Sequence, residues 1–91
     1  MRKIKDLTQG KEKVYIILKT EEIQKKFMSD AEKEGIAFSD GGNLKGRKCE
    51  DVMVLYDNGT LRYLGWAGRI LFHHMKEKIL CVDYEKFIAE Q

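Results

Sequence analysis

The chain has 91 residues, of which 43% are hydrophobic, 35% are charged and none is proline, and its net charge is +2. A chain of this length buries roughly 65% of the surface of its unfolded form, which is enough for one core. Its longest apolar run covers residues 14–18, far short of the ~20 residues that cross a bilayer. A secretory signal has an apolar stretch after its basic N-terminus, and this sequence has none there. We therefore expect a single cytoplasmic domain over residues 1–91, with no membrane partner.

Residues 1–13 form a basic N-terminal arm in which two residues after Met1 are large and apolar. These are Ile4 and Leu7, whose spacing of three fits a helical turn, and Gly10 ends this segment. Residues 14–19 then continue with an unbroken run of β-branched, aromatic and aliphatic residues. Such a run predicts a central strand that is covered on both faces.

The clearest helix signal follows this strand, over residues 21–34. Thr20 precedes it as an N-cap, because its hydroxyl can accept a hydrogen bond from a first-turn amide. Gly35 follows it and can adopt the left-handed conformation that ends a helix. One apolar stripe is expected to face the core, made of Ile23, Phe27, Met28 and Ala31.

A short strand and a hairpin are predicted in the middle of the chain. Residues 36–39 are extended, with their two large apolar residues on one face, and residues 40–50 form a loop rich in glycine and basic residues. Strands at 52–56 and 60–64 flank an Asn-Gly pair at 58–59. This pair tolerates the positive φ angles of a type I′ turn, and it therefore predicts the hairpin.

The segment over residues 65–77 is ambiguous, and we interpret it as a loop with a short helical turn, starting from a break at residues 65–68. Residues 79–82 predict another strand. Asp83 then caps a last short helix over residues 84–90. The apolar residues of this helix, Tyr84, Phe87 and Ile88, are expected to face inward.

This order of elements predicts an α+β fold. A strand, a helix and a second strand are followed by a hairpin, which favours a small two-layer domain with a mostly antiparallel sheet. The helix at 21–34 would pack on one face of the sheet, and the short C-terminal helix would close the domain.

The loop at residues 40–48 is the first candidate site. It combines three glycines with Lys45, Arg47 and Lys48, and backbone amides beside positive side chains can hold an anion or a partner. It is not a nucleotide-binding phosphate loop, since Arg47 and Lys48 stand where that motif needs lysine and a hydroxyl residue. The alternative interpretation is an ordinary solvated connection.

The second candidate site is formed by Tyr63, Trp66 and Arg69. An exposed tryptophan beside arginine can anchor a protein partner or stack on a base. In the alternative interpretation, Trp66 folds back as the lid of a small core.

The cysteines and histidines give no strong motif. Cys49 and Cys81 are too few for a disulfide scaffold and lack the close pairing of zinc ligands. His73 and His74 are adjacent, so they point in different directions on either a strand or a helix. We therefore expect no metal, no cofactor and no catalytic residue.

Part of the chain resembles a pattern common in small uncharacterised phage and prophage proteins. In that pattern, a strand ending in Lys-Thr-Glu-Glu, as at residues 19–22, leads into a helix. A Gly-hydrophobic-x-aromatic-Ser-x-Gly segment follows, as at residues 35–41, and a closing strand and helix match residues 79–87. The family usually has tryptophan where this chain has Phe38. The basic loop and the segment at 65–69 are outside the pattern, so the resemblance implies no binding role for either of them. The resemblance implies an accessory role in counter-defence, as in inhibitors of CRISPR nucleases or sponges for signalling nucleotides.

Three hypotheses on function follow. The first is a non-catalytic factor that inhibits a host defence protein or sequesters an anionic small molecule through the two candidate sites. The second is a nucleic-acid-binding domain that also uses the lysines of the N-terminal arm, although its basic excess is small for a duplex-DNA binder. The third is a small thiol-dependent enzyme. Exposed strand edges also leave a homodimer open.

Overall fold

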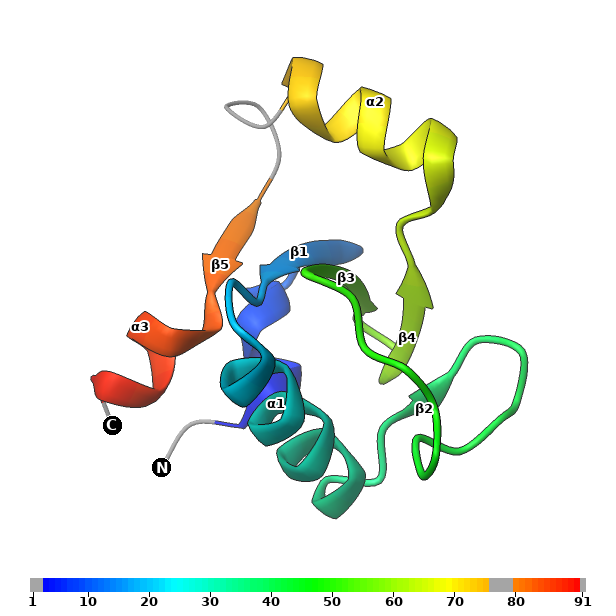
Figure 1. The fold of residues 1–91 in the computed structure, drawn as a ribbon, viewed down its shortest axis with the longest axis vertical. Coiled ribbons are helices and arrows are strands. Elements are labelled where there is room, and N and C mark those ends of the chain that lie inside the picture. Colours follow the sequence, from blue (N-terminus) through cyan, green and yellow to red (C-terminus); the bar gives the residue numbers. More distant parts are fainter. Residues whose placement is uncertain (1–2, 76–79, 91) are drawn as a thin grey trace.

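The computed structural model describes residues 3–75 and 80–90 and has the α+β fold predicted from the sequence. Residues 76–77 of the ambiguous segment, and Ile79 at the start of the predicted 79–82 strand, lie outside the described residues. Within the described ranges, no helix has the length and apolar character needed to span a membrane. The elements in chain order are η1 (Ile4–Thr8), β1 (Lys13–Ile17), α1 (Glu21–Lys33), β2 (Ala37–Phe38), β3 (Val52–Tyr56), β4 (Thr60–Tyr63), α2 (Gly65–Met75), β5 (Cys81–Asp83) and α3 (Tyr84–Ala89) (Figure 1).

The strands form one five-stranded sheet in the order β2-β4-β3-β1-β5. The three inner strands are antiparallel, since β3 pairs in this way with both β1 and β4. The two edge strands run parallel to their neighbours, β5 beside β1 and β2 beside β4. The sheet is therefore mixed but mostly antiparallel, as predicted.

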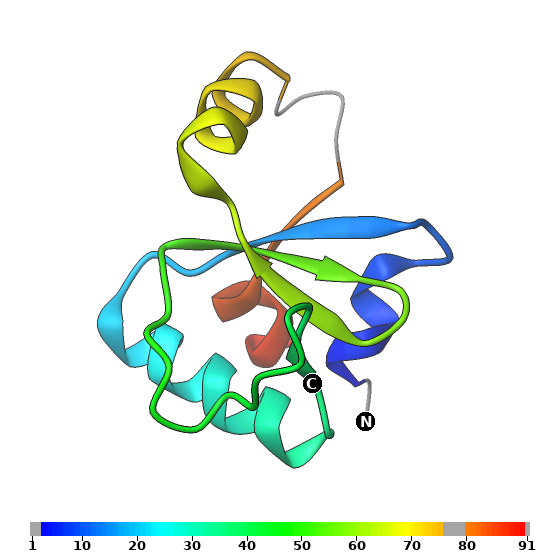
Figure 2. The ribbon, with the colours of Figure 1, turned by 90° about the vertical axis from the view of Figure 1, so that its right-hand side faces the viewer.

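The main core lies on one face of the sheet, under η1, α1 and α3 (Figures 1 and 2). Alternate residues of β1, Val14 and Ile16, point into it and are fully buried. α1 adds Ile23, Phe27 and Ala31, whereas Met28, expected on the same stripe, is only half-buried. The remaining members of this core are Ile4, Leu7, Leu18, Ile36, Phe38, Leu44, Met53, Leu55, Leu61, Tyr84 and Phe87.

The predicted helix ends are confirmed. The Ile23 amide donates to the Thr20 hydroxyl over 3.2 Å, and Gly35 adopts a positive φ of 77° after α1. At α3 the amide of Glu85 donates to the Asp83 carboxylate over 3.1 Å. Local capping chemistry in the sequence therefore located both helices correctly.

The hairpin between β3 and β4 forms as predicted, but its turn is not of type I′. The Gly59 amide donates to the Tyr56 carbonyl over 3.0 Å, which places Asp57 and Asn58 at the two central positions of the turn. Only Gly59 has a positive φ, of 83°. The loop is therefore three residues long with glycine at the left-handed position, so Asn58 needs no strained backbone.

The prediction of a loop with a short helical turn after β4 is wrong. This segment forms the helix α2, which has 11 residues. Gly65 makes the entry to the helix with a φ of 73° instead of breaking the chain. Gly68 lies inside the helix, where a Cβ would stand 3.2 Å from the Leu64 side chain. Packing against Leu64 thus accounts for a glycine that otherwise disfavours a helix.

A second, smaller cluster covers the other face of the sheet. Tyr15, Val52 and Val54 form it from the strands, and Leu64 and Phe72 close it from the α2 side. The Tyr15 and Phe72 rings stack with their centroids 5.7 Å apart. Because both faces of β1 are covered, its sequence is apolar without alternation, as we predicted.

Candidate functional site

A groove of about 470 Å³ lies between α1 and the segment at residues 44–49. Figure 2 shows this part of the chain running beside α1, on the opposite side of the molecule from η1. Most of the lining residues are polar or charged, although the surface that they expose to the groove is largely apolar. The lining residues are Glu21, Gln24, Lys25, Met28, Ser29 and Glu32 from α1, and Leu44, Lys45, Gly46, Arg47, Lys48 and Cys49 from the segment.

Arg47 is held by contacts within the protein. Its guanidinium lies 4.2 Å above the centre of the Phe38 ring, and its Nη2 is 3.1 Å from an oxygen of Asp40. Phe38 in turn stacks on Tyr63, with ring centroids 5.1 Å apart. Arg47 and Tyr63 therefore both contact the Phe38 ring, and these contacts order the 40–48 loop.

Asp40 connects the two ends of this loop. One carboxylate oxygen accepts a hydrogen bond of 2.8 Å from the Gly42 amide, and the other bonds Arg47. These two contacts, the Gly42 amide first, lower the pKa of the Asp40 carboxyl below its ordinary value. The pKa of Arg47 is raised, mainly by Asp40 and then by the Tyr63 hydroxyl, so Arg47 stays positively charged, and the Asp40 carboxylate offsets that charge.

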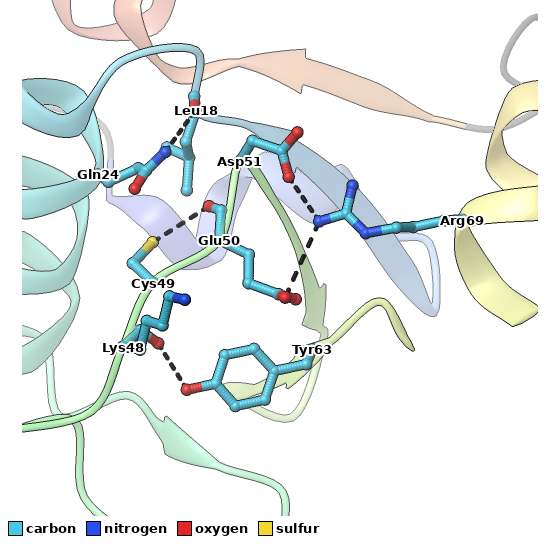
Figure 3. A network of polar contacts seen from close by, with 8 residues as sticks. All are labelled: Leu18, Gln24, Lys48, Cys49, Glu50, Asp51, Tyr63 and Arg69. Carbon is cyan, nitrogen blue, oxygen red and sulfur yellow. Dashed lines mark hydrogen bonds and ion pairs between the residues drawn. The ribbon is translucent and has the colours of Figure 1, made fainter. Parts of the chain in front are cut away.

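Tyr63 and Arg69 both contact the segment that leads into β3 (Figure 3). The Tyr63 hydroxyl donates to the Lys48 carbonyl over 2.5 Å. From α2, the Arg69 Nη2 lies 2.6 Å from an oxygen of Asp51 and 3.9 Å from one of Glu50. The two candidate sites are therefore neighbours, and hydrogen bonds and ion pairs join them.

Trp66 does not act as a lid on the core. Its side chain is 81% exposed on α2, so the interpretation that it folds back is wrong. Ile70 and Leu71 are also large apolar residues with substantial exposure, 44% and 50%. We call Trp66, Ile70 and Leu71 the α2 patch.

Lys45 and Lys48 are exposed on the wall of the groove. Within the described residues, neither amine has a carboxylate within 4 Å. Of the three basic residues predicted in the loop, these two keep their charge available for a ligand.

Cys49 is a poor nucleophile. It lies half-buried at the groove, and its thiol donates to the Glu50 carbonyl over 3.4 Å (Figure 3). Burial, with the nearby charges of Glu50 and Asp51, raises the pKa of the Cys49 thiol to about 12. The thiol is therefore neutral at physiological pH and behaves as a small apolar group in the groove.

His73 and His74 are both exposed on α2. In the described parts of the chain, no three His, Cys, Asp or Glu side chains come together as a metal site would require. These histidines therefore belong to the surface that surrounds the α2 patch.

Sequence reasoning missed the acidic partners of the two arginines. Asp40 bonds Arg47, and Asp51 bonds Arg69. The Asp-Gly-Gly segment at residues 40–42 carries a signal for the first pair, because aspartate often accepts a hydrogen bond from the amide two residues on. The second pair joins residues 18 positions apart, and no local pattern announces it.

Comparison with known proteins finds no matching family model, no curated protein and no solved structure that is similar to this chain.

Proposed function

We propose that the protein is a non-catalytic binding factor that holds a partner protein on the α2 patch. The observation that carries this proposal is the exposure of Trp66, 81%, on a helix that Arg69 ties to Asp51. Tryptophan is enriched among the residues that dominate the energy of protein interfaces. A large aromatic side chain on an anchored helix also loses little conformational freedom when it binds.

The surroundings of Trp66 support a protein partner. Ile70 follows four residues later, so both side chains lie on the same side of α2, and the exposed Leu71 extends the apolar surface. Contiguous exposed apolar side chains of this kind are typical of interaction surfaces. In the form implied by the resemblance to phage proteins, the partner is a host defence protein that loses its activity when bound.

The distribution of charge favours this role over nucleic-acid binding. Arg47 and Arg69 are both engaged by carboxylates, so they offer little net charge to a phosphate backbone. η1, in the basic N-terminal arm, lies on the other side of the molecule from the 44–49 segment (Figure 2). A nucleic-acid ligand needs a continuous basic surface.

The test compares capture of proteins from a bacterial lysate by the wild-type chain, Trp66→Ala and the control Lys33→Ala. Lys33 is an exposed residue of α1 outside both candidate sites. A partner retained by the wild type and the control is then purified for calorimetry. We expect Trp66→Ala to weaken its affinity by roughly 30-fold or more, as for an interface residue worth about 2 kcal/mol.

The circular dichroism spectrum should not change, because the Trp66 side chain makes little contact with the core. Equal affinity of Trp66→Ala and wild type would refute the proposal. Binding that falls steeply as the salt concentration rises, and that Lys45→Gln with Lys48→Gln removes while Trp66→Ala does not, would instead favour an electrostatic partner.

A further inference from the structure

The groove between α1 and the 44–49 segment is a second surface, and no residue of the α2 patch lines it. We propose that this groove binds a small amphipathic anion, that is, an apolar body with one terminal acidic group. This inference is independent of a protein partner on α2.

The size and floor of the groove fit the apolar body of such a ligand. Its volume of about 470 Å³ lies within the range of roughly 300–1,000 Å³ that is common for small-molecule sites. Met28, Leu44 and Cys49 provide apolar surface between the polar residues of the two walls. Among the described residues no aromatic side chain lines the groove, so these walls offer a base no ring to stack on.

The charges of the two walls orient the acidic group. On the 44–49 segment every charged side chain is basic, and Lys45 and Lys48 have no carboxylate within ion-pair distance among the described residues. Arg47 adds to this wall, although Asp40 already binds it. The α1 wall is of mixed sign, with Glu21 and Glu32 beside Lys25. An anionic group is therefore attracted to the segment and away from the two glutamates.

The basic wall is ordered before any ligand arrives. The Arg47–Asp40 ion pair fixes the middle of the loop, and the hydrogen bond from Tyr63 fixes the carbonyl of Lys48. On the other side, the Gln24 side-chain amide donates to the Leu18 carbonyl over 3.1 Å, which holds it at the start of α1 (Figure 3). A groove with ordered walls pays less entropy on binding than a mobile loop.

The experiment uses two probes with the same apolar body. 1-Anilinonaphthalene-8-sulfonate carries an acidic group, whereas N-phenyl-1-naphthylamine lacks it. Binding is followed by fluorescence titration and by amide chemical shifts of the folded protein. The test variant carries both Lys45→Gln and Lys48→Gln. The control variant carries Lys3→Gln and Lys33→Gln, which remove the same charge from two exposed positions outside the groove.

We expect the sulfonate to bind at least about tenfold more tightly than the neutral probe, because its hydrogen bonds to lysine amines are charge-assisted and the neutral probe can make none. The Lys45/Lys48 pair should remove most of that difference, and the control pair should keep it. Amide shifts should concentrate in residues 21–32 and 44–49. Trp66→Ala should leave them unchanged, which separates this site from the α2 patch.

Equal affinity for the two probes, an equal loss in both lysine pairs, or shifts centred on α2 would each overturn the proposal. Only the last of these outcomes bears on the α2 patch. The proposed function and the proposal for the groove are therefore tested by different measurements.

Discussion

Arg69 on α2 places its Nη2 atom 2.6 Å from the Oδ1 atom of Asp51, the residue that immediately precedes β3. Beyond the cluster formed with Phe72 and Leu64, the ion pairs of Arg69 with Asp51 and, at 3.9 Å, with Glu50 fix α2 relative to the sheet. The presentation of Trp66 therefore depends on a salt bridge between two distant parts of the sequence.

Removal of this salt bridge is expected to loosen α2 without unfolding the domain. The Asp51 side chain is 56% exposed, so Arg69→Ala should lower the free energy of unfolding by no more than about 1 kcal/mol. Amide hydrogen exchange in α2 should accelerate much more than exchange in β1 or β3. The control is Arg62→Ala, which removes an exposed arginine from β4. Unchanged exchange in α2 would show that the hydrophobic cluster alone holds the helix.

Stability should fall in acid because of two carboxyls. In the folded state, a hydrogen bond from the Gly42 amide lowers the pKa of Asp40. A hydrogen bond from Arg69 lowers the pKa of Asp51 in the same way. Each carboxylate therefore contributes its stabilisation fully above the ordinary pKa of about 3.9 and loses it as the pH falls through the lower folded value. Carboxyl titrations by NMR should show both shifts. In Arg69→Ala the Asp51 pKa should rise towards its ordinary value, while that of Asp40 should stay low.

Gly42→Ala tests the order of the 40–48 loop. A Cβ at this position would stand 2.6 Å from Nη1 of Arg47 and 3.1 Å from Oδ1 of Asp40. Because the guanidinium is the flexible end of a side chain, it should move aside at a cost of under about 1 kcal/mol, as for most surface substitutions. The Asp40–Arg47 bond should lengthen and the pKa of Asp40 should rise. A titration of Asp40 identical to that of the wild type would contradict this account.

Phe72→Ala is expected to cost far more than a change on the outer face of the same helix. Phe72 is buried and stacks on Tyr15, so its truncation should lower the free energy of unfolding by about 3 kcal/mol, the lower end for a core phenylalanine. Leu71→Ala is the control, because its side chain is 50% exposed and should cost less than half as much. Urea denaturation measures both values. Equal costs would mean that α2 does not pack as described.

The Cys49 thiol should react slowly in the folded protein. Its pKa of about 12 leaves very little thiolate at pH 8, so its reaction with Ellman's reagent should be at least about 100-fold slower than after unfolding in guanidinium. Measurement in a Cys81→Ser background isolates this residue. A fast reaction in the folded state would support the hypothesis of a thiol-dependent enzyme.

Much of the fold could be predicted because its signals are local. Thr20 and Gly35 mark the ends of α1, Asp83 caps α3, and the apolar run in β1 indicates a strand covered on both faces. The helix α2 could not be predicted in this way. Gly65 and Gly68 weaken its intrinsic propensity, and it is formed because Leu64 and Phe72 pack on side chains from distant strands.

The candidate sites could be predicted only by residue type. The sequence singled out the basic loop and Trp66 but left open whether Trp66 is exposed or folds back, and the roles of Arg47 and Arg69 depend on carboxylates elsewhere in the fold. Met28 was predicted in the core because a helical wheel cannot distinguish a buried position from one beside a groove. Side-chain partners across the sheet are set by topology, and local patterns do not carry that information.

The parallel pairing of β5 with β1 has a consequence for biosynthesis. β1 leaves the ribosome well before β5, so the edge of β1 that pairs with β5 stays unpaired until Cys81–Asp83 has been translated. The Tyr84 ring then meets Phe27 edge-on, with centroids 5.1 Å apart, and Phe87 follows. The hydrophobic core is therefore complete only after α3 has been translated. A product truncated before α3 is expected to stay partly unfolded, to bind chaperones and to be degraded by proteases.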